Sequence, residues 1–530
     1  MDMIFYNGLV RTLDGVRPLC GGVIVKNGVI AALLSELEAA ELAKRLPEAR
    51  TVDMEGGLLL PGFTDSHLHL LEYGKNKRNV DLSAADSLEA LIRLCKDADR
   101  GGKGWLLGVG FDHQRWQRKA LPTRVELDRI SRERPLAVRR VCYHLSVVNS
   151  RGVERLMECG AALSEEERST GLLKEQRQEW ISASCGLPAK AELKDLIVSA
   201  CADAAAKGLT QVHTDDFEAF SGGREAVIAA YRELAQAELL PVRIYQQCLL
   251  STEEKLHSFL EQGYRSGQRT GFYELGPLKL LADGSLGAKT AALRGRYRDG
   301  TGRGQLNYED GQLLALIERA HRAGMQVAIH CIGDAALEQA VGCFEQVMEG
   351  FRRANPRHGI VHCQLADAGL RRRMARLSLL AYVQPVFVPS DMELAARCLD
   401  EELAAESYNW RGLLDLGVHV SGGSDCPVEP FDVLPNLYYA MTRKNRPGTK
   451  VWHGEHCLSA AEAVRMFTWE GAYASFGERR RGSLSPGKEA DMVLLDRDIL
   501  SRECGPEALR DAAVRMTVAG GRIVWDGRAV

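Results

Sequence analysis

The chain has 530 residues, with 68 lysines and arginines against 71 aspartates and glutamates, a formal net charge of −3. At ~100–200 residues per domain, this length predicts more than one domain. The near balance of charge excludes the basic surface of a nucleic-acid-binding protein and a polybasic membrane patch. With 45% hydrophobic and 26% charged residues, the composition is that of a soluble globular protein and excludes general disorder.

The 14 cysteines are scattered along the chain and form no Cys-x-x-Cys pair, so they indicate neither a zinc ribbon nor a thioredoxin-type site. We interpret them as buried, reduced thiols in a reducing compartment. The first eight residues lack the basic and apolar regions of a signal peptide, and no apolar run approaches the ~18 residues of a membrane span. We therefore expect a cytoplasmic protein.

The two ends of the chain predict short strands separated by turns. The β-rich runs near the N-terminus are Met3–Leu13, Gly22–Lys26 and Gly28–Leu33, and those near the C-terminus are Ala490–Leu495, Arg515–Val518 and Arg522–Trp525. Asn27-Gly28 and Gly520-Gly521 are typical of tight hairpin turns. Because the termini of a domain often lie close together, residues 1–57 and 482–530 are predicted to form one composite β-sandwich.

The middle of the chain alternates short apolar runs with helical patterns, as βα units around a parallel sheet do. The predicted strands are Leu58–Thr64, Thr210–His213, Val242–Gln246, Gly276–Leu281, Gln326–His330, Gly359–His362, Leu379–Gln384 and Val418–Gly422. The predicted helices are Ala191–Lys207, Arg224–Glu238, Thr252–Gln262, Glu309–Ala323, Ala335–Gly350, Asp367–Leu377 and Ser459–Tyr473. Eight such strands predict an α/β fold, a (β/α)8 TIM barrel of residues 58–74 and 190–481.

About 140 residues separate the first two barrel strands, which is too many for a βα loop. This stretch has strand candidates of its own at Trp105–Val109 and Leu136–Tyr143, and a polar helical region at Ser164–Glu179. We predict that residues 75–189 form an inserted subdomain over the mouth of the barrel.

Residues that can bind a metal lie at the ends of five predicted strands. The candidates are His67, His69, Lys279, His330, His362 and Asp425. Because barrel active sites lie at the C-terminal ends of the strands, these side chains are predicted to meet at one rim. Residues two apart on an extended segment face the same side, so His67 and His69 can bind one ion together. Imidazole suits Zn²⁺, although other divalent metals would fit.

A second ion would need further ligands, and His330 and His362 could supply them. Lysine is a poor ligand as an ammonium, but carboxylated Lys279 would bridge two ions ~3.5–4 Å apart. Each feature alone has a structural alternative, since a strand-end histidine is often only hydrogen-bonded and Ser424-Asp425 could cap a helix. Their occurrence at one end of the strands favours the metal site. His257 and His321 fall in predicted helices, and we interpret them as surface residues.

Several motifs carry a family resemblance. Pro61-Gly-Phe-Thr-Asp-Ser-His-Leu-His69 resembles the opening motif of the amidohydrolase superfamily. More narrowly, the chain resembles amidohydrolase family 3, the YtcJ-like group that includes N-substituted formamide deformylase, through Lys279–Leu293, Ala328–Ala336, Gly423–Glu429 and Gly482–Asp491. The resemblance implies a barrel with a small composite sandwich, and an enzyme that hydrolyses carbon–nitrogen bonds other than peptide bonds (EC 3.5).

The same resemblance extends to the insert and suggests residues that contact the substrate. It implies substrate-facing roles for Asp112, His113, Trp116 and His144; the alternative is that these residues only fold the insert. We add Asp283 and Gln384, which follow the fourth strand and end the seventh, to the predicted substrate-binding set.

These observations predict a metal-dependent amidohydrolase. One or two Zn²⁺ would activate a water, the hydroxide would attack an amide carbonyl, and Asp425 would transfer the proton as the catalytic residue. One alternative is hydrolysis of a cyclic amide or imide, an ester or a carbamate at the same site. The other is a catalytically silent binding or regulatory protein. We expect a small-molecule amide-type substrate and no nucleic-acid or membrane partner. Barrels of this type often pair, which makes a homodimer a further expectation.

Overall fold

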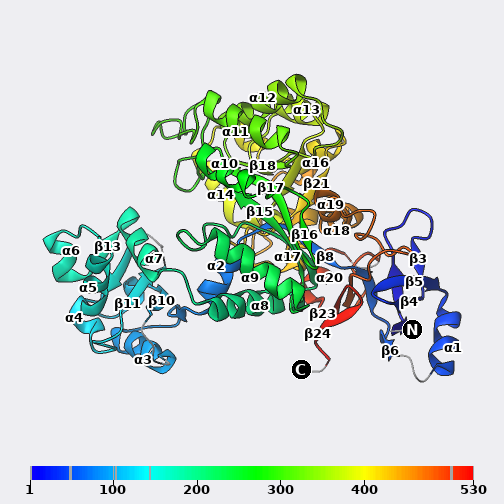
Figure 1. Ribbon diagram of the computed structural model, residues 1–530, viewed down its shortest axis with the longest axis horizontal. Coiled ribbons are helices and arrows are strands. Elements are labelled where there is room, and N and C mark those ends of the chain that lie inside the picture. The colour runs from blue at the N-terminus through cyan, green and yellow to red at the C-terminus, as the bar shows by residue number, and fades with distance from the viewer. Residues whose placement is uncertain are drawn as a thin grey trace. The chain divides into compact units, whose positions relative to one another are not determined.

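The computed structural model describes residues 3–46, 50–99, 101, 104–141, 145–501 and 505–528. The chain divides into two compact units. The larger unit comprises Met1–Leu70, Ile197–Asp216 and Tyr231–Val530, and the smaller unit comprises Leu71–Leu196 and Phe217–Ala230. Figure 1 labels the elements of both units. Among the helices of the described ranges, none is long and apolar enough to cross a membrane.

Eight parallel strands form the centre of the larger unit (Figure 1). They are β8 (Phe63–Leu68), β14 (Leu209–Thr214), β15 (Arg243–Leu249), β17 (Tyr273–Leu281), β18 (Val327–Cys331), β19 (Gly359–His362), β20 (Leu380–Val383) and β21 (Val420–Gly422). They pair in chain order, and β21 returns to contact β8, so the barrel is nearly closed. Every residue of β14 and β15 is buried, as in a parallel strand covered on both faces. The predicted TIM-barrel-like α/β fold is confirmed.

Helices follow most of these strands, at the positions that the sequence predicts. They are α8 (Lys190–Ala206), α9 (Arg224–Gln236), α10 (Glu253–Glu261), α11 (Asp310–Arg322), α12 (Asp334–Gly350) and α13 (Ala368–Arg376). The predicted helix Ser459–Tyr473 is divided into α18 (Ala460–Met466) and α19 (Trp469–Ala474). At the break, the Phe467 carbonyl accepts a hydrogen bond of 2.6 Å from the N–H of Thr64 in β8. The break between α18 and α19 therefore provides a hydrogen bond to the first barrel strand, β8.

Two further sheets of the larger unit contain the terminal strands: the first has N-terminal strands alone, and the second combines strands from both ends of the chain. One has the order β5 (Val29–Leu34), β4 (Gly22–Lys26), β1 (Met3–Tyr6), β6 (Arg50–Asp53). The other has the order β24 (Arg522–Asp526), β23 (Val514–Ala519), β22 (Met492–Leu495), β7 (Leu58–Pro61), β2 (Leu9–Arg11), β3 (Leu19–Cys20). A single cluster of buried side chains, which includes Phe5, Val23, Leu59 and Met492, contains residues of both sheets.

The structure corrects two predicted strands, because each crosses from one sheet to another. The run Leu58–Thr64 ends in β7 at Pro61 and restarts in β8 at Phe63. Gly62 makes this transition, since a Cβ there would lie 2.3 Å from the Thr210 side chain. The run Met3–Leu13 is divided in the same way at Asn7, whose φ of 57° turns the chain out of β1 and into β2.

The smaller unit contains a five-stranded sheet and holds the whole of the predicted insert, residues 75–189. Its sheet order is β13 (Leu172–Lys174), β12 (Leu145–Val148), β11 (Leu136–Arg140), β10 (Leu106–Phe111), β9 (Val80–Asp81). The predicted helical region over Ser164–Glu179 is only partly correct, because strand β13 interrupts it. Helix α6 (Glu165–Thr170) ends at Gly171, whose φ of 74° reverses the chain into β13.

Candidate metal centre

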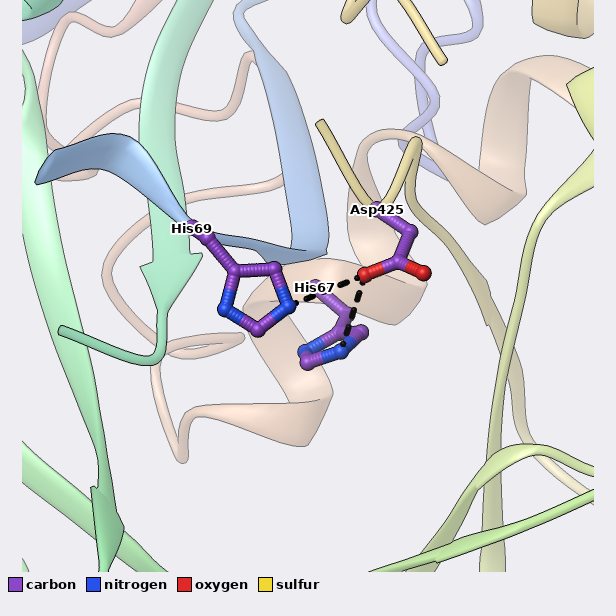
Figure 2. A group of neighbouring side chains, drawn as sticks. All are labelled: His67, His69 and Asp425. Carbon is purple, nitrogen blue, oxygen red and sulfur yellow. Dashed lines mark ion pairs between the residues drawn. The ribbon is translucent and has the colours of Figure 1, made fainter. Parts of the chain in front are cut away.

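Two histidines and one aspartate meet at the C-terminal end of the barrel (Figure 2). His67 lies in β8 and His69 directly follows it, while Asp425 lies in the loop after β21. Oδ1 of Asp425 is 3.3 Å from Nε2 of His67 and 3.1 Å from Nε2 of His69. One donor atom from each residue therefore lies within 4.8 Å of the other two. This is the donor set that Zn²⁺ and similar ions prefer.

The environment of Asp425 fits a cation. Its buried Oδ1 faces the Nε2 atoms of His67 and His69, and a cation placed among these three atoms would balance the buried charge of the carboxylate. The Asp425 backbone has a φ of 61° and donates its N–H to the carbonyl of His67 at 2.8 Å. Gly423 permits this approach, because a Cβ there would lie 2.7 Å from the His67 nitrogen. The loop is therefore shaped to bring the carboxylate to the two imidazoles.

Asp65 connects the two segments that supply these ligands. Its Oδ1 accepts the N–H groups of His67 at 3.0 Å and of Ser424 at 3.2 Å. Burial raises the pKa of Asp65 to about 7, against the lowering effect of these hydrogen bonds. The side chain thus positions the backbone on both sides of the site.

Lys279, in β17, is brought to the same place. Its Nζ lies 3.3 Å from Nε2 of His67, and the side chain is buried. Burial lowers the pKa of this lysine, which favours the neutral amine, the form that reacts with carbon dioxide.

His330 and His362 complete a contiguous group of imidazoles. The ring centroids of His330 and His362 are 4.5 Å apart, and those of His362 and His67 are 5.5 Å apart. Burial lowers the pKa of His362 to about 4 and the pKa values of His67 and His330 well below their usual value. These rings are therefore neutral at physiological pH, which is the form that binds metals.

His69 and Asp425 behave as a coupled pair. Burial would lower the pKa of His69, but its hydrogen bond to Asp425 and the charge of that carboxylate raise it to about 9. Burial likewise opposes the ionisation of Asp425, yet the hydrogen bond from His69 and the neighbouring imidazoles hold its pKa below the usual range. The arrangement keeps Asp425 anionic, as a ligand must be.

Two predicted substrate-binding residues support neighbouring segments in the larger unit. Asp283 accepts N–H groups from Ala292, Ile332 and Gly333 at 2.9, 3.1 and 2.8 Å. Gln384 places its Oε1 2.8 Å from Nδ1 of His362. Contact of either residue with a substrate stays a prediction.

The other predicted substrate-binding residues belong to the smaller unit. Trp116 is buried in its core and donates its indole N–H to the Ala85 carbonyl at 2.8 Å. Asp112 pairs with Arg140 at 2.8 Å and caps the short helix that begins at His113. His144 lies outside the described residues. Roles of these residues in binding substrate also remain predictions.

Gln247 also contacts the site, although the sequence did not predict this. This residue of β15 is buried, and its Oε1 lies 2.6 Å from Nδ1 of His67. The available signal was a pair of adjacent amides, Gln246-Gln247, within a buried strand.

A family model described as the amidohydrolase family matches residues 50–525. The chain belongs to this family. It is 29% identical over 544 residues to the putative amidohydrolase YtcJ of Bacillus subtilis (strain 168), which covers 99% of this chain and 100% of the relative. It is 26% identical over 555 residues to N-substituted formamide deformylase of Arthrobacter pascens, which covers 99% and 98%. These matches confirm the family resemblance that the motifs indicate.

The fold is also similar to that of a solved metal-dependent hydrolase. The crystal structure of an uncharacterized metal-dependent hydrolase from Pyrococcus furiosus superimposes with a TM-score of 0.80 at 27% identity, and the match covers 94% of this chain and 100% of that one.

Proposed function

We propose that the protein is a metal-dependent hydrolase that cleaves an amide-type carbon–nitrogen bond, other than a peptide bond, in a small molecule. The convergence of His67, His69 and Asp425 within 4.8 Å carries this proposal. Membership of the amidohydrolase family supports hydrolysis, and the deformylase among the relatives supports the amide-type bond.

The residues suit one or two ions. Nε2 of His67 and of His69 would hold the first ion together with Asp425, and His330 and His362 would hold a second, with carboxylated Lys279 between them. When bound, Zn²⁺ or another divalent ion supplies a water whose pKa is lowered toward ~7, and hence hydroxide near neutral pH.

Asp425 is the group suited to move the proton. Its carboxylate is held anionic beside two imidazoles, so it can accept a proton at an oxygen and then donate it to the departing nitrogen. Asp65 and Gly423 hold the backbone so that the carboxylate keeps its place during this transfer.

The proposal also covers the compartment, the oligomeric state and the terminal sheets of the protein. We infer a cytoplasmic enzyme, working as a homodimer on a small molecule without nucleic-acid or membrane partners. The near-neutral charge and the free cysteines of the described residues support this setting. We also infer that the two terminal sheets act as one composite β-sandwich, supported by their shared core.

Metal content and activity together test the function. The purified protein is stripped with a chelator, reloaded with Zn²⁺, and assayed on N-substituted formamides and acetamides, cyclic imides, esters and carbamates. His67→Ala should abolish Zn²⁺ binding and turnover, while His257→Ala, on an exposed face of α10, should change neither. Full turnover by the stripped protein would contradict the proposal. Zn²⁺ binding without turnover of any compound would favour the silent homologue instead.

A further inference from the structure

We propose that Gln247 and Gln384 are positioning residues that fix the tautomers of His67 and His362, so that Nε2 of each ring presents its lone pair to the metal site. This inference rests on the proposed metal centre. It gives a role to two buried amides that the proposed reaction does not use.

The contacts of Gln247 determine the direction of each hydrogen bond around it. Its Nε2 donates to the carbonyl of Ser66 at 3.1 Å. A carbonyl oxygen can only accept, so the amide orientation is fixed and Oε1 must face Nδ1 of His67, 2.6 Å away. Because Oε1 also can only accept, the proton of His67 must lie on Nδ1. The lone pair is then on Nε2, the nitrogen that faces Asp425.

Gln384 makes the same two kinds of contact on the other side of the barrel. Its Nε2 donates to the Tyr382 carbonyl at 3.2 Å, and its Oε1 lies 2.8 Å from Nδ1 of His362. The backbone carbonyl orients the amide, and the amide orients the ring. His362 therefore carries its proton on Nδ1 and its lone pair on Nε2.

The other two histidines reach a backbone carbonyl directly. Nδ1 of His69 lies 3.2 Å from the Asp215 carbonyl, so Nε2 can bind the metal once the proton that it donates to Asp425 has left. Nε2 of His330 lies 3.0 Å from the Gly284 carbonyl, which leaves Nδ1. All four rings thus have one nitrogen held by an acceptor. For His67 and His362, a glutamine lies between the backbone carbonyl and the ring. Its amide nitrogen donates to the carbonyl, and its amide oxygen accepts the ring proton.

Removal of either glutamine side chain should weaken metal binding, because the ring loses its hydrogen-bond acceptor. Without the Oε1 acceptor, His67 can rotate or place its proton on Nε2, and that tautomer cannot bind a cation. Loss of such a supporting hydrogen bond typically costs 10–100-fold in metal affinity. A carboxyl group at the same position would still accept the Nδ1 proton, and in its protonated form it would also donate to the Ser66 carbonyl, so Gln247→Glu should rescue the site.

The test measures the Zn²⁺ dissociation constant of the full-length protein by competition with a chelator. Gln247→Met and Gln384→Met, which keep the side-chain length, should each weaken binding by ~10–100-fold, while Gln247→Glu should stay within ~3-fold of wild type. Gln246→Met is the matched control, because Gln246 is equally buried on β15 but its Nε2 contacts backbone carbonyls, not an imidazole. It should leave the dissociation constant unchanged.

A second measurement needs no variant that must fold. In Zn²⁺-loaded wild-type protein labelled with ¹⁵N-histidine, the resonances of His67 and His362 should show a protonated Nδ1. A protonated Nε2 in either ring, or unchanged Zn²⁺ affinity in both folded methionine variants, would overturn the inference. If His67→Ala also bound Zn²⁺ as tightly as wild type, the metal centre itself would be wrong, which separates the two failures.

Discussion

The guanidinium of Arg243 donates two hydrogen bonds, of 2.7 and 3.0 Å, to the carboxylate of Asp491. Arg243 begins barrel strand β15, and Asp491 directly precedes β22 of the terminal sheets. Their side chains are only 6% and 3% exposed, and the same carboxylate accepts the N–H of Gly520 at 2.6 Å. A buried, bidentate ion pair therefore joins the barrel to the sheet formed by both ends of the chain.

Substitution of Asp491 should destabilise the larger unit. Asp491→Ala leaves the Arg243 charge buried with a partner removed, and such a loss costs ~3–5 kcal/mol. The denaturant midpoint of the larger unit should fall accordingly. Glu393→Ala is the control, because its partner Lys450 lies in an exposed pair and its loss should hardly move the midpoint. Equal midpoints for the two variants would show that the buried pair adds no stability.

Substitution of Asp425 should separate chemistry from folding. Asp425→Asn keeps the size of the side chain but cannot carry the proton, so kcat should fall by ~10²-fold or more. The melting temperature of the stripped protein should change little. Because Asp425 is also a proposed ligand, the variant is assayed at saturating Zn²⁺ with bound metal measured in parallel. Near-normal kcat in the metal-replete variant would assign the proton transfer to another group.

Two buried histidines outside the metal centre form a polarised chain. The N–H of Val327 donates to Nδ1 of His358 at 3.0 Å, so the His358 proton lies on Nε2 and points to Nδ1 of His321, 2.8 Å away. Nε2 of His321 then donates to the Phe351 carbonyl at 2.7 Å. Neither ring can gain a proton without breaking a bond of this chain.

These hydrogen bonds between His358 and His321 predict that the stability of the protein falls at acid pH. Burial, then His321 and Arg353, holds the pKa of His358 well below its usual value, and burial lowers that of His321 despite its bond to Phe351. Both pKa values are lower in the folded than in the unfolded protein, so the unfolded state binds more protons once the pH falls below ~6.5. The stability from this pair is complete above that pH and is lost as the pH falls.

The comparison with His358→Asn measures this effect, since asparagine does not titrate and keeps an acceptor for Val327. In stripped protein, the melting temperature of wild type relative to the variant should be highest at pH 8 and fall by ~2–4 °C or more at pH 5.5. The metal-site histidines titrate in both proteins, so their effect on the melting temperature cancels in the comparison. A difference that is independent of pH would contradict this assignment.

The sequence predicted the elements that repeat and missed the contacts that depend on three-dimensional neighbours. Seven of the eight barrel strands lie where the sequence predicts them, and the proposed ligands lie at or just after strand ends. The split at Gly62 was not predictable, because it depends on the approach of Thr210 from another strand. The prediction that His321 lies on the surface is wrong for the same reason. A histidine on helix α11 gives no sequence signal of burial, but His358, directly before β19, supplies its buried partner. The contact of Gln247 with His67 could not be predicted, because the sequence does not show which face of β15 lies against His67.

The charges around the strand ends bear on the choice of substrate. Lys289, on the segment after β17, is paired with Asp299, and Arg294 pairs with Asp334 at 2.7 Å and with Asp367. Lys279 is buried, and its Nζ lies 3.3 Å from Nε2 of His67 in the candidate metal centre. These cations are therefore engaged within the protein and offer little to an anionic substrate.

We accordingly expect the enzyme to prefer a neutral or weakly polar N-substituted amide over a highly charged one. Binding of a carboxylate at this rim would have to break an existing ion pair, which costs more than the new contact returns when the partner is left buried, as Asp334 would be. The test compares kcat/KM of the Zn²⁺-loaded enzyme for N-acyl amino acids with that for their neutral amides, alongside N-substituted formamides, acetamides and cyclic ureides. The neutral compounds should react as fast or faster. A preference of more than ~10-fold for the free carboxylate would mean that a cation binds the substrate, and the prediction would be wrong.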